Sequence, residues 1–321
     1  MPILSARMDG AYMQTIFNII NIPLGWVLEF LAGIFGGNFA ASVFVFTLLA
    51  NLAFIPLTIK SQKSSVQQTR IKPKLDELKK RYGDDKQKYS EAMQQLYQEE
   101  NVSMSGGCLP MIIRLVVMMS IYWLIMSPLT YLLHIDSATI SDAATQLGLS
   151  ANARSELQII EAVRNGSLNF PEIASKLETL NFNFFGIDLT QTPKFSFDIF
   201  NDIKPIWAMP IIAFLAQMLT SVLSTLMQKK INSDAPNMMG MMLTMPLISL
   251  FIGFSLPGGV TFYWACSSLI GGFIQLAVQQ FYGPHKMLSR ERLKELNKEC
   301  DFEADQIKKI GQVKQAEKDA E

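Results

Sequence analysis

The sequence predicts an all-α protein that crosses a membrane several times, and three observations predict it. The chain is 49% hydrophobic and only 17% charged, whereas soluble proteins average about 25% charged residues. Five segments are apolar over about the 20 residues that a membrane-crossing helix requires. Lysine and arginine gather at alternate ends of these segments, which is the pattern of the positive-inside rule. The predicted spans are 39–59, 107–133, 205–228, 238–256 and 259–282.

The segment before the first span has a different character. Asn18, Asn21 and Pro23 interrupt the apolar stretch 12–36. We therefore expect residues 1–38 to be an external N-terminal region with an amphipathic helix that lies on the membrane surface. A signal segment that ends near residue 41 is the alternative for this stretch.

The placement of basic residues predicts the orientation. Arg7 alone precedes the first span, several lysines follow it, and no Lys or Arg follows the second span until Arg154. Lys229 and Lys230 follow the third span, and basic residues follow the fifth. We therefore expect an external N-terminus and a cytoplasmic C-terminus. The parts between spans are then a cytoplasmic helical hairpin (60–106), an external region (134–204), a short cytoplasmic loop (229–237) and a charged cytoplasmic tail (283–321).

The external region has its own predicted structure. Residues 147–166 are typical of a pair of helices, and residues 182–191, "FNFFGIDLTQ", are typical of an extended segment.

The sequence excludes several functional classes. It has no nucleophile elbow, metalloprotease motif or phosphate-binding loop. The spans hold no Asp, Glu or Lys away from their ends, so an intramembrane protease or a proton pump would lack titratable groups. The three cysteines and two histidines are not spaced as metal ligands. We therefore expect no enzyme activity, cofactor or metal, and the zero net charge indicates no nucleic-acid partner.

Two polar residues are unusual in their spans. At a rise of about 1.5 Å per residue, Arg114 lies about 9 Å and Asn51 about 12 Å from the cytoplasmic end of its span. Arg114 either extends to the membrane surface or faces a water-filled cavity. Because both residues fall in the cytoplasmic half of consecutive spans, one cavity open to the cytoplasm would hold both. Serine and threonine in spans have an alternative role as hydrogen-bonding partners between helices.

Three stretches resemble the YidC/Oxa-type membrane protein insertases. They are "FTLLANLAFIPLTIKSQKSSVQQTRIKPKLDELKKRYGDD", "GCLPMIIR" followed by "IYWLI", and "LPGGVTFYWACSSLIGGFIQLAVQQ". The resemblance runs from about residue 22 to residue 285 and leaves out 134–204. It implies five helices around a hydrophilic groove that is open to the cytoplasm and to lipid. Such a groove moves the short polar flanks of nascent membrane proteins and releases their hydrophobic segments into lipid.

The resemblance also implies site residues. Family members typically have an arginine five residues before the proline that corresponds to Pro56, where this chain has Asn51, and more often glutamine where it has Arg114. We therefore expect Arg114 to be a relocated groove arginine that attracts an acidic or polar flank. The rest of the polar lining is expected from Asn51, Gln217, Ser221 and Gln275. A hydrophobic sliding surface is expected from Leu215, Met218, Phe262, Tyr263 and Trp264, for which ordinary packing is the alternative.

The expected partners are nascent membrane proteins and the lipid bilayer. For the hairpin and the tail, the resemblance implies the ribosome, the signal-recognition system and the Sec translocon. The hairpin has 10 basic and 7 acidic residues over 60–105, and a solvated surface is the alternative. A bacterial plasma membrane of the Gram-positive type is expected, since the chain lacks an Arg/Ser-rich start and a large extra external domain. The alternative function is a small-anion channel or transporter with an arginine-lined vestibule, and a scaffold for membrane complexes is compatible with insertion.

Overall fold

The computed structural model describes residues 2–102, 108–149, 153–193, 204–231 and 239–283, and short pieces between 286 and 309. Within these ranges, the side chains of 2–17, 69, 108–111, 114, 153–154, 228–231 and 239–243 are not described. The chain divides into two compact units. The first comprises Met1–Pro56 and Cys108–Leu276, and the second comprises Leu57–Gly107 and Ala277–Glu321.

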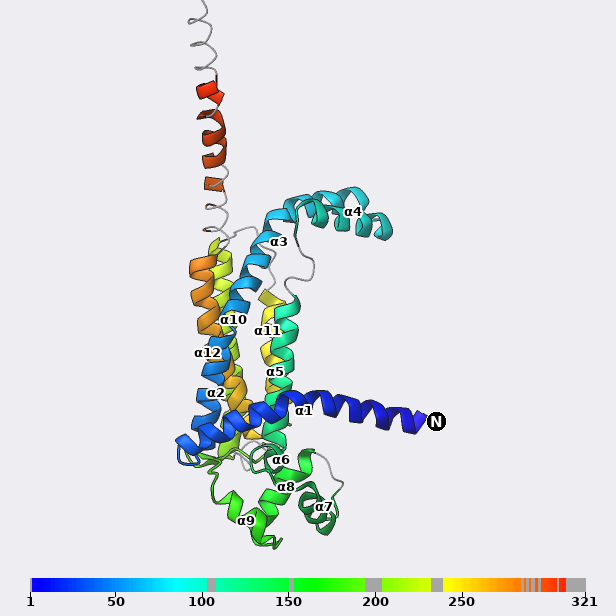
Figure 1. Cartoon of the computed structure of the whole chain (residues 1–321), viewed down its shortest axis with the longest axis vertical. Coiled ribbons are helices and arrows are strands. Elements are labelled where there is room, and N and C mark those ends of the chain that lie inside the picture. Colours follow the sequence, from blue (N-terminus) through cyan, green and yellow to red (C-terminus); the bar gives the residue numbers. More distant parts are fainter. Residues whose placement is uncertain are drawn as a thin grey trace, which may run out of the picture. The chain divides into compact units, whose positions relative to one another are not determined.

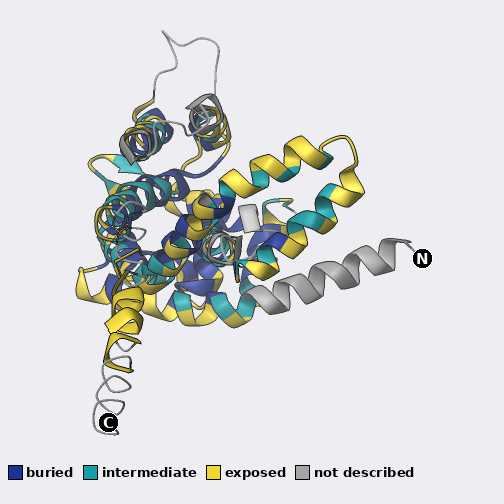
Figure 2. Cartoon of the chain, turned by 90° about the horizontal axis from the view of Figure 1, so that it is seen from above, coloured by how far each residue is buried: buried dark blue, intermediate teal, exposed yellow. Residues whose placement is uncertain are grey.

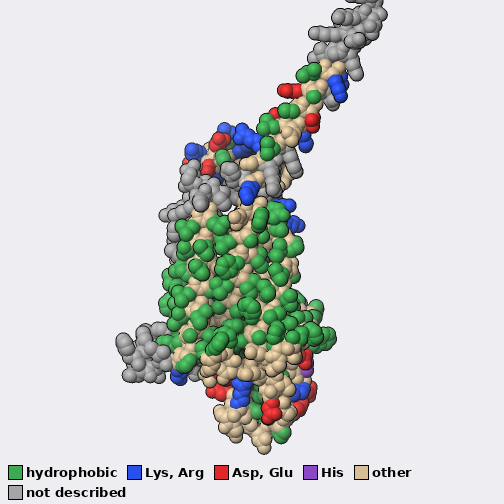
Figure 3. All heavy atoms as spheres, turned by 90° about the vertical axis from the view of Figure 1, so that its left-hand side faces the viewer, with side chains coloured by type: hydrophobic (Ala, Val, Ile, Leu, Met, Phe, Trp, Pro, Cys, Tyr) green, Lys and Arg blue, Asp and Glu red, His purple; other side chains and the backbone are tan. Residues whose placement is uncertain are grey.

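Most of the apolar sequence lies in six helices (Figure 1). They are α1 (Pro2–Ile34), α2 (Phe39–Ala53), α5 (Cys108–Met126), α10 (Ala208–Ile231), α11 (Met239–Gly253) and α12 (Gly258–Tyr282), and a 3-10 turn, η1 (Pro205–Trp207), leads into α10. Hydrophobic side chains cover one face of these helices in a broad band, with charged side chains of the region 134–204 below it (Figure 3). This surface is that of a protein embedded in lipid.

The lengths of these helices bear on the number of spans. Among the described residues, Pro205–Met227 and Gly258–Tyr282 are each long and apolar enough to cross a membrane. α2 and the first part of α3 (Ile55–Tyr82) would make a third span with a bend of 49° between them. The described apolar stretches of α5 and α11, Leu115–Met126 and Thr244–Gly253, are shorter. The predicted all-α membrane protein is confirmed, whereas five spans remain a prediction.

The first helix differs from the prediction. α1 runs unbroken from Pro2 to Ile34 with Pro23 inside it, so the predicted interruption is wrong. Pro23 lies on the exposed side of the helix, and Asn18 accepts a hydrogen bond from the Tyr131 hydroxyl at 2.6 Å. The helix therefore continues through Pro23, and the Asn18 side chain is hydrogen-bonded to Tyr131 of α6 (Pro128–Tyr131).

The position and surface of α1 suit the predicted interfacial helix. Figure 1 shows α1 lying across α2 and α5 rather than alongside them. Trp26, Phe30 and Ile34 are exposed, whereas Leu28 and Leu31 are buried. An apolar face that the protein leaves uncovered is what a helix at the membrane surface requires.

The region 134–204 folds as a small helical layer with one hairpin. It contains α7 (Ser137–Gln146), α8 (Ala153–Arg164), α9 (Pro171–Leu177), β1 (Asn183–Phe184) and β2 (Ile187–Asp188). The predicted helix pair over 147–166 shows one helix in its described part, because α7 ends at Gln146 and Gly148 takes a φ of +66°. The predicted extended segment contains the antiparallel pair β1–β2.

One large hydrophobic cluster joins this layer to the helix ends. Its buried members include Phe39 of α2, Ile125 of α5, Ile160 of α8, Val260 of α12 and Leu189 after β2. Figure 2 shows the buried residues along the inward sides of the helices and the exposed residues on their outer sides. The region 134–204 and the apolar helices therefore share one buried hydrophobic cluster.

The second unit contains most of α3 and all of α4 (Lys86–Glu99), with Val66, Ile71 and Leu96 buried. The Asp85 side chain accepts a hydrogen bond from the Lys88 N–H at 3.1 Å, which caps the start of α4. Glu100 pairs with Arg70 at 2.9 Å and also with Lys74. These contacts close the two helices into a hairpin.

Candidate functional site

A cavity of about 690 Å³ opens among α5, α10, α11 and α12, and we call it the four-helix cavity. None of the described residues that line it is charged. Its polar lining consists of Gln217, Thr220, Ser221, Ser224, Ser249, Ser267, Ser268 and Gln275. The rest of the lining is Met118, Met245, Pro246, Ile248, Ile252, Tyr263, Trp264, Gly271 and Gly272.

Helical spacing gathers the polar groups on the cavity walls. On α10, Gln217, Ser221 and Ser224 follow one another at intervals of four and three residues, which places them on one face of the helix. On α12, Ser267, Gly271 and Gln275 recur every four residues. The opposite face of α10 exposes Leu215, Leu219 and other large apolar side chains, so each helix presents a polar face inward and an apolar face outward.

One hydrogen bond crosses the cavity wall from α10 to α11. The Ser249 hydroxyl lies 2.7 Å from Gln217 Oε1 and 2.7 Å from the carbonyl oxygen of Pro246. Because the hydroxyl has one hydrogen, it donates to one of these oxygens at a time. Gln217 can therefore exchange its partner within the protein for a group that enters the cavity.

A close approach fixes α10 against α12. A Cβ atom on Gly272 would lie 2.3 Å from Cγ2 of Thr220, so only glycine permits this crossing. The Thr220 hydroxyl lies 3.0 Å and 3.1 Å from the carbonyl oxygens of Ala216 and Gln217. Ala213, Ala216 and Ala265 form a small buried cluster at the same pair of helices. Small residues of this kind let membrane helices pack closely.

The structure brings five of the predicted site residues together. Gln217, Ser221 and Gln275 of the predicted polar lining meet in the four-helix cavity, and Tyr263 and Trp264 of the predicted sliding surface lie beside them.

The other two predicted polar residues stand apart from this group. Asn51 is 7% exposed on α2, where its Nδ2 donates to the Thr47 carbonyl oxygen at 2.8 Å, and it is not among the lining residues. Arg114 belongs to α5, and its side chain lies outside the described residues.

The remaining sliding-surface residues have different environments. Leu215 is 57% exposed and Met218 is half-buried. Phe262 is buried, with its ring 4.8 Å from the ring of Phe184 in β1. Leu215 thus lies on an outer apolar surface, whereas Phe262 packs against the hairpin.

Sequence reasoning did not single out the contribution of α11. Met245, Ile248, Ser249 and Ile252 form this wall. Met245 closes the methionine-rich run that begins at Met238, and Ser249 is a polar residue within a predicted span. The methionine-rich run and Ser249 were visible in the sequence, but residue spacing alone does not predict which neighbouring helix this face contacts.

The region 134–204 closes one end of the helix cluster. The N–H groups of Gly258 and Gly259 donate to the carbonyl oxygens of Gln191 and Leu189 at 2.8 Å and 2.7 Å. A Cβ atom on Gly259 would lie 2.9 Å from Cγ2 of Ile125 and 3.4 Å from Phe39. The first turn of α12 therefore meets α2, α5 and the segment after β2 at one point.

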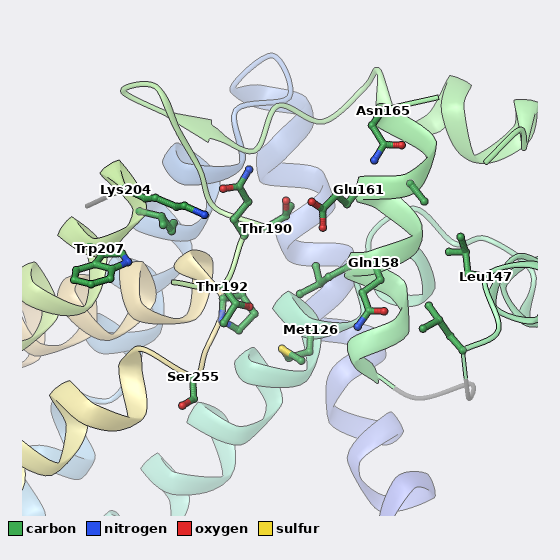
Figure 4. A pocket seen from close by; sticks show the side chains of 16 residues that line it. Met126, Leu147, Gln158, Glu161, Asn165, Thr190, Thr192, Lys204, Trp207 and Ser255 are labelled. Atoms are coloured by element: carbon green, nitrogen blue, oxygen red, sulfur yellow. The ribbon is translucent and has the colours of Figure 1, made fainter. Parts of the chain in front are cut away.

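A second cavity, of about 1050 Å³, lies between the region 134–204 and the ends of α5, η1 and the α11–α12 connection. Figure 4 shows Gln158 and Glu161 on α8, and Asn165 directly after it, at one side and Lys204 at the other, with Thr190 between them. Trp207 and Ser255 also line it, and the Trp207 ring packs against Phe254 with the ring centres 5.3 Å apart. Among the described residues, no group of three or more His, Cys, Asp or Glu side chains could hold a metal.

Two apolar helices of membrane-spanning length, α10 and α12, define an integral membrane protein, and uncharged polar side chains line part of a cavity between them. Residues 30–285 match the family model described as 60Kd inner membrane protein, and the chain belongs to this family.

Individual curated proteins also match parts of this chain. The chain is 40% identical over 110 residues to "Membrane protein insertase YidC" of Methylococcus capsulatus, covering 34% of this chain and 20% of the relative. It is 42% identical over 104 residues to the protein of that name from Cellvibrio japonicus, covering 32% and 19%. For the one from Ectopseudomonas mendocina the identity is 38% over 104 residues, covering 32% and 18%. The matches thus span about a fifth of the length of these curated relatives.

Proposed function

We propose that this chain is a membrane protein insertase, which moves short polar flanks of nascent membrane proteins through a polar groove that faces the cytoplasm and releases their hydrophobic segments into lipid, alone or with the Sec channel. The observation that carries the proposal is the four-helix cavity, whose described lining is uncharged and combines eight polar side chains with apolar ones, between helices with apolar outer surfaces. The family and the names of the relatives support the same activity.

The energetic basis is the transfer of apolar surface. Moving a hydrophobic segment from water into lipid gains about 25 cal/mol for each Å² of apolar surface. The cost falls on the polar flank, whose backbone groups lose their water. Gln217, Ser249 and Gln275 can each donate and accept hydrogen bonds, so they lower this cost in the cavity. Insertion of this kind forms no covalent bond, so we propose no catalytic residue, cofactor or metal.

We further propose that Arg114 adds a positive charge to this groove. α5 is helical at positions 114 and 118, and residues four apart share a helix face. Position 114 therefore falls on the face of α5 that carries Met118, which lines the cavity. An arginine there would attract an acidic flank that enters from the cytoplasm, and the buried Asn51 would contribute to the polar surroundings on α2.

The proposed topology has five spans, with the N-terminus outside and the C-terminus in the cytoplasm. The hairpin 60–106 and the tail 283–321 then face the cytoplasm, where they could meet the ribosome, the signal-recognition system and the Sec translocon. The alternating distribution of basic residues supports this orientation.

An insertion assay in cells tests the proposal. Arg114→Ala is expected to impair insertion of a substrate with an acidic translocated flank, and Arg114→Lys is expected to retain most of it. Normal insertion by the alanine variant would contradict the role of Arg114. The double variant Asn51→Arg with Arg114→Gln is expected to keep partial or full activity, because the positive charge then lies on the neighbouring helix α2.

A further inference from the structure

The tip of the β1–β2 hairpin carries a phenylalanine in an unusual backbone conformation. Phe185 and Gly186 form the turn between the paired residues Phe184 and Ile187, with φ values of +49° and +83°. A two-residue turn with two positive φ angles favours Asn-Gly, because a bulky side chain is disfavoured at positive φ. Phe185 is nevertheless 92% exposed. The protein's own packing therefore does not explain why a large apolar residue stands here.

The hairpin is fixed beside the ends of the apolar helices. The ring of Phe185 lies 4.8 Å from that of Phe184, whose ring in turn lies 4.8 Å from that of Phe262 on α12. On the other side, the Phe39 N–H at the start of α2 donates to the Asn181 carbonyl oxygen at 3.0 Å. The hairpin is thus held by the first turns of α2 and α12.

Other exposed apolar side chains lie at the same end of the helix cluster, on α1. α1 ends at Ile34, directly before the turn that leads into α2, and it exposes Trp26, Phe30 and Ile34. The Asn181 N–H donates to the Gly37 carbonyl oxygen at 2.8 Å, which ties the hairpin to this turn. Phe185 and the apolar face of α1 therefore belong to one end of the helix cluster.

We propose that Phe185 inserts into the boundary between lipid headgroups and acyl chains, and that the hairpin thereby anchors the region 134–204 to the membrane surface. Tryptophan and tyrosine are enriched at this boundary, and phenylalanine is among the apolar residues that interfacial helices bury there. Burial of the ring in lipid offsets the unfavourable backbone conformation and explains why an exposed Phe stands where Asn would suit the turn. The continuity of the tip with α12 and α1 favours lipid over a protein partner.

Spin labelling in nanodiscs that each hold one copy of the chain, in a mixture of phosphatidylcholine and phosphatidylglycerol, tests the proposal. A nitroxide is placed by Phe185→Cys after Cys108, Cys266 and Cys300 are replaced by alanine. Labels at Glu172, exposed on α9, and at Leu219, exposed on α10, are the water and lipid controls. We expect the ratio of oxygen to nickel-chelate collisions at 185 to be several times that at 172. A ratio equal to that at 172, or one that rises only in discs with two copies, would overturn the proposal.

A second experiment uses the native side chain, since a label is itself apolar. A phosphatidylcholine with a photoactivatable group near its headgroup is incorporated, and cross-links on residues 182–189 are counted by mass spectrometry. Phe185→Trp should retain them, whereas Phe185→Asn should lower them at least several-fold. Because Asn tolerates the positive φ, this loss would not come from unfolding. An unchanged yield in the Asn variant would contradict lipid insertion.

Discussion

The backbone N–H of Gly259 donates a hydrogen bond to the carbonyl oxygen of Leu189 at 2.7 Å. The first N–H groups of a helix have no partner within that helix, and here the segment after β2 supplies the acceptors. The region 134–204 therefore completes the first turn of a membrane helix. Its removal would leave two buried N–H groups of α12 without their acceptors.

Gly259→Val should destabilise the protein. The new side chain would meet Ile125, Phe39 and the Leu189 carbonyl oxygen, all of which lie within 3.4 Å of a Cβ atom built on this glycine. Overpacking of this kind costs about 1–3 kcal/mol. Thermal unfolding in detergent, followed with a thiol-reactive dye on buried Cys266 after Cys108 and Cys300 are replaced by alanine, should show a lower midpoint.

Gly33→Ala is the matched control for this variant. No atom lies within 4 Å of a Cβ placed on Gly33, which is exposed in α1. Alanine in a helix is favoured over glycine by about 0.5–1 kcal/mol, so its midpoint should stay the same or rise. Equal losses in the two variants would argue against a tight junction at Gly259.

Glu156→Gln should change the pH dependence of the region 134–204. Glu156 is 6% exposed, and its carboxylate accepts hydrogen bonds from the Thr130 N–H at 3.1 Å and hydroxyl at 2.7 Å. Burial raises the pKa of this carboxyl above its ordinary value of 4.5, although the bonds from Thr130 act in the opposite direction. The folded state then holds the proton more tightly than the unfolded state, so stability falls as the pH rises through the window above 4.5.

Glutamine cannot ionise but can still accept a hydrogen bond from Thr130. The stability of the variant should therefore not decrease as the pH rises through this window. Amide hydrogen exchange of α8, compared between about pH 4 and pH 8 after correction for intrinsic rates, measures the difference. The same pH dependence in both proteins would show that Glu156 does not titrate in this window.

Glu100→Gln should destabilise the end of the α3–α4 hairpin, where Glu100 pairs with Arg70 and Lys74. The pKa of Glu100 is lowered, chiefly by its hydrogen bond from Lys74, and Arg70 adds to the effect. Exchange at the buried Val102 should rise in the variant, and the difference should shrink in high salt because exposed ion pairs are screened. A difference independent of salt would assign the effect to packing instead.

Gln217→Leu should reduce insertion of substrates with polar flanks. The change removes one donor and acceptor from the four-helix cavity at similar volume, and a hydrogen bond contributes about 0.5–1.5 kcal/mol. Such a loss lowers the insertion rate about 2- to 10-fold. Leu219→Met, on the exposed side of the same helix, is the control. A pulse-labelled insertion assay that found equal rates for both variants would argue against a polar role for Gln217.

The sequence predicts the helices because apolar runs and basic flanks are local properties. It predicts three of the cavity's polar residues because Gln and Ser are conspicuous in apolar spans. The sequence does not predict the continuous α1, because a proline on an exposed face, such as Pro23, can be accommodated when tertiary contacts hold the helix. Phe262 packs against Phe184, and the α11 wall meets α10, through contacts between distant parts of the chain. Periodicity does not encode such contacts.

Photocrosslinking from Ser267, on the wall of the four-helix cavity, tests the central claim most directly. A benzophenone amino acid is placed there and, as a control, at Leu219, which is exposed on α10 and does not line the cavity. With a stalled nascent membrane protein whose flank has begun to enter, we expect adducts from 267 in clear excess over 219. Equal yields at both positions, together with solute flux through the protein in liposomes, would contradict the insertase account and favour a channel.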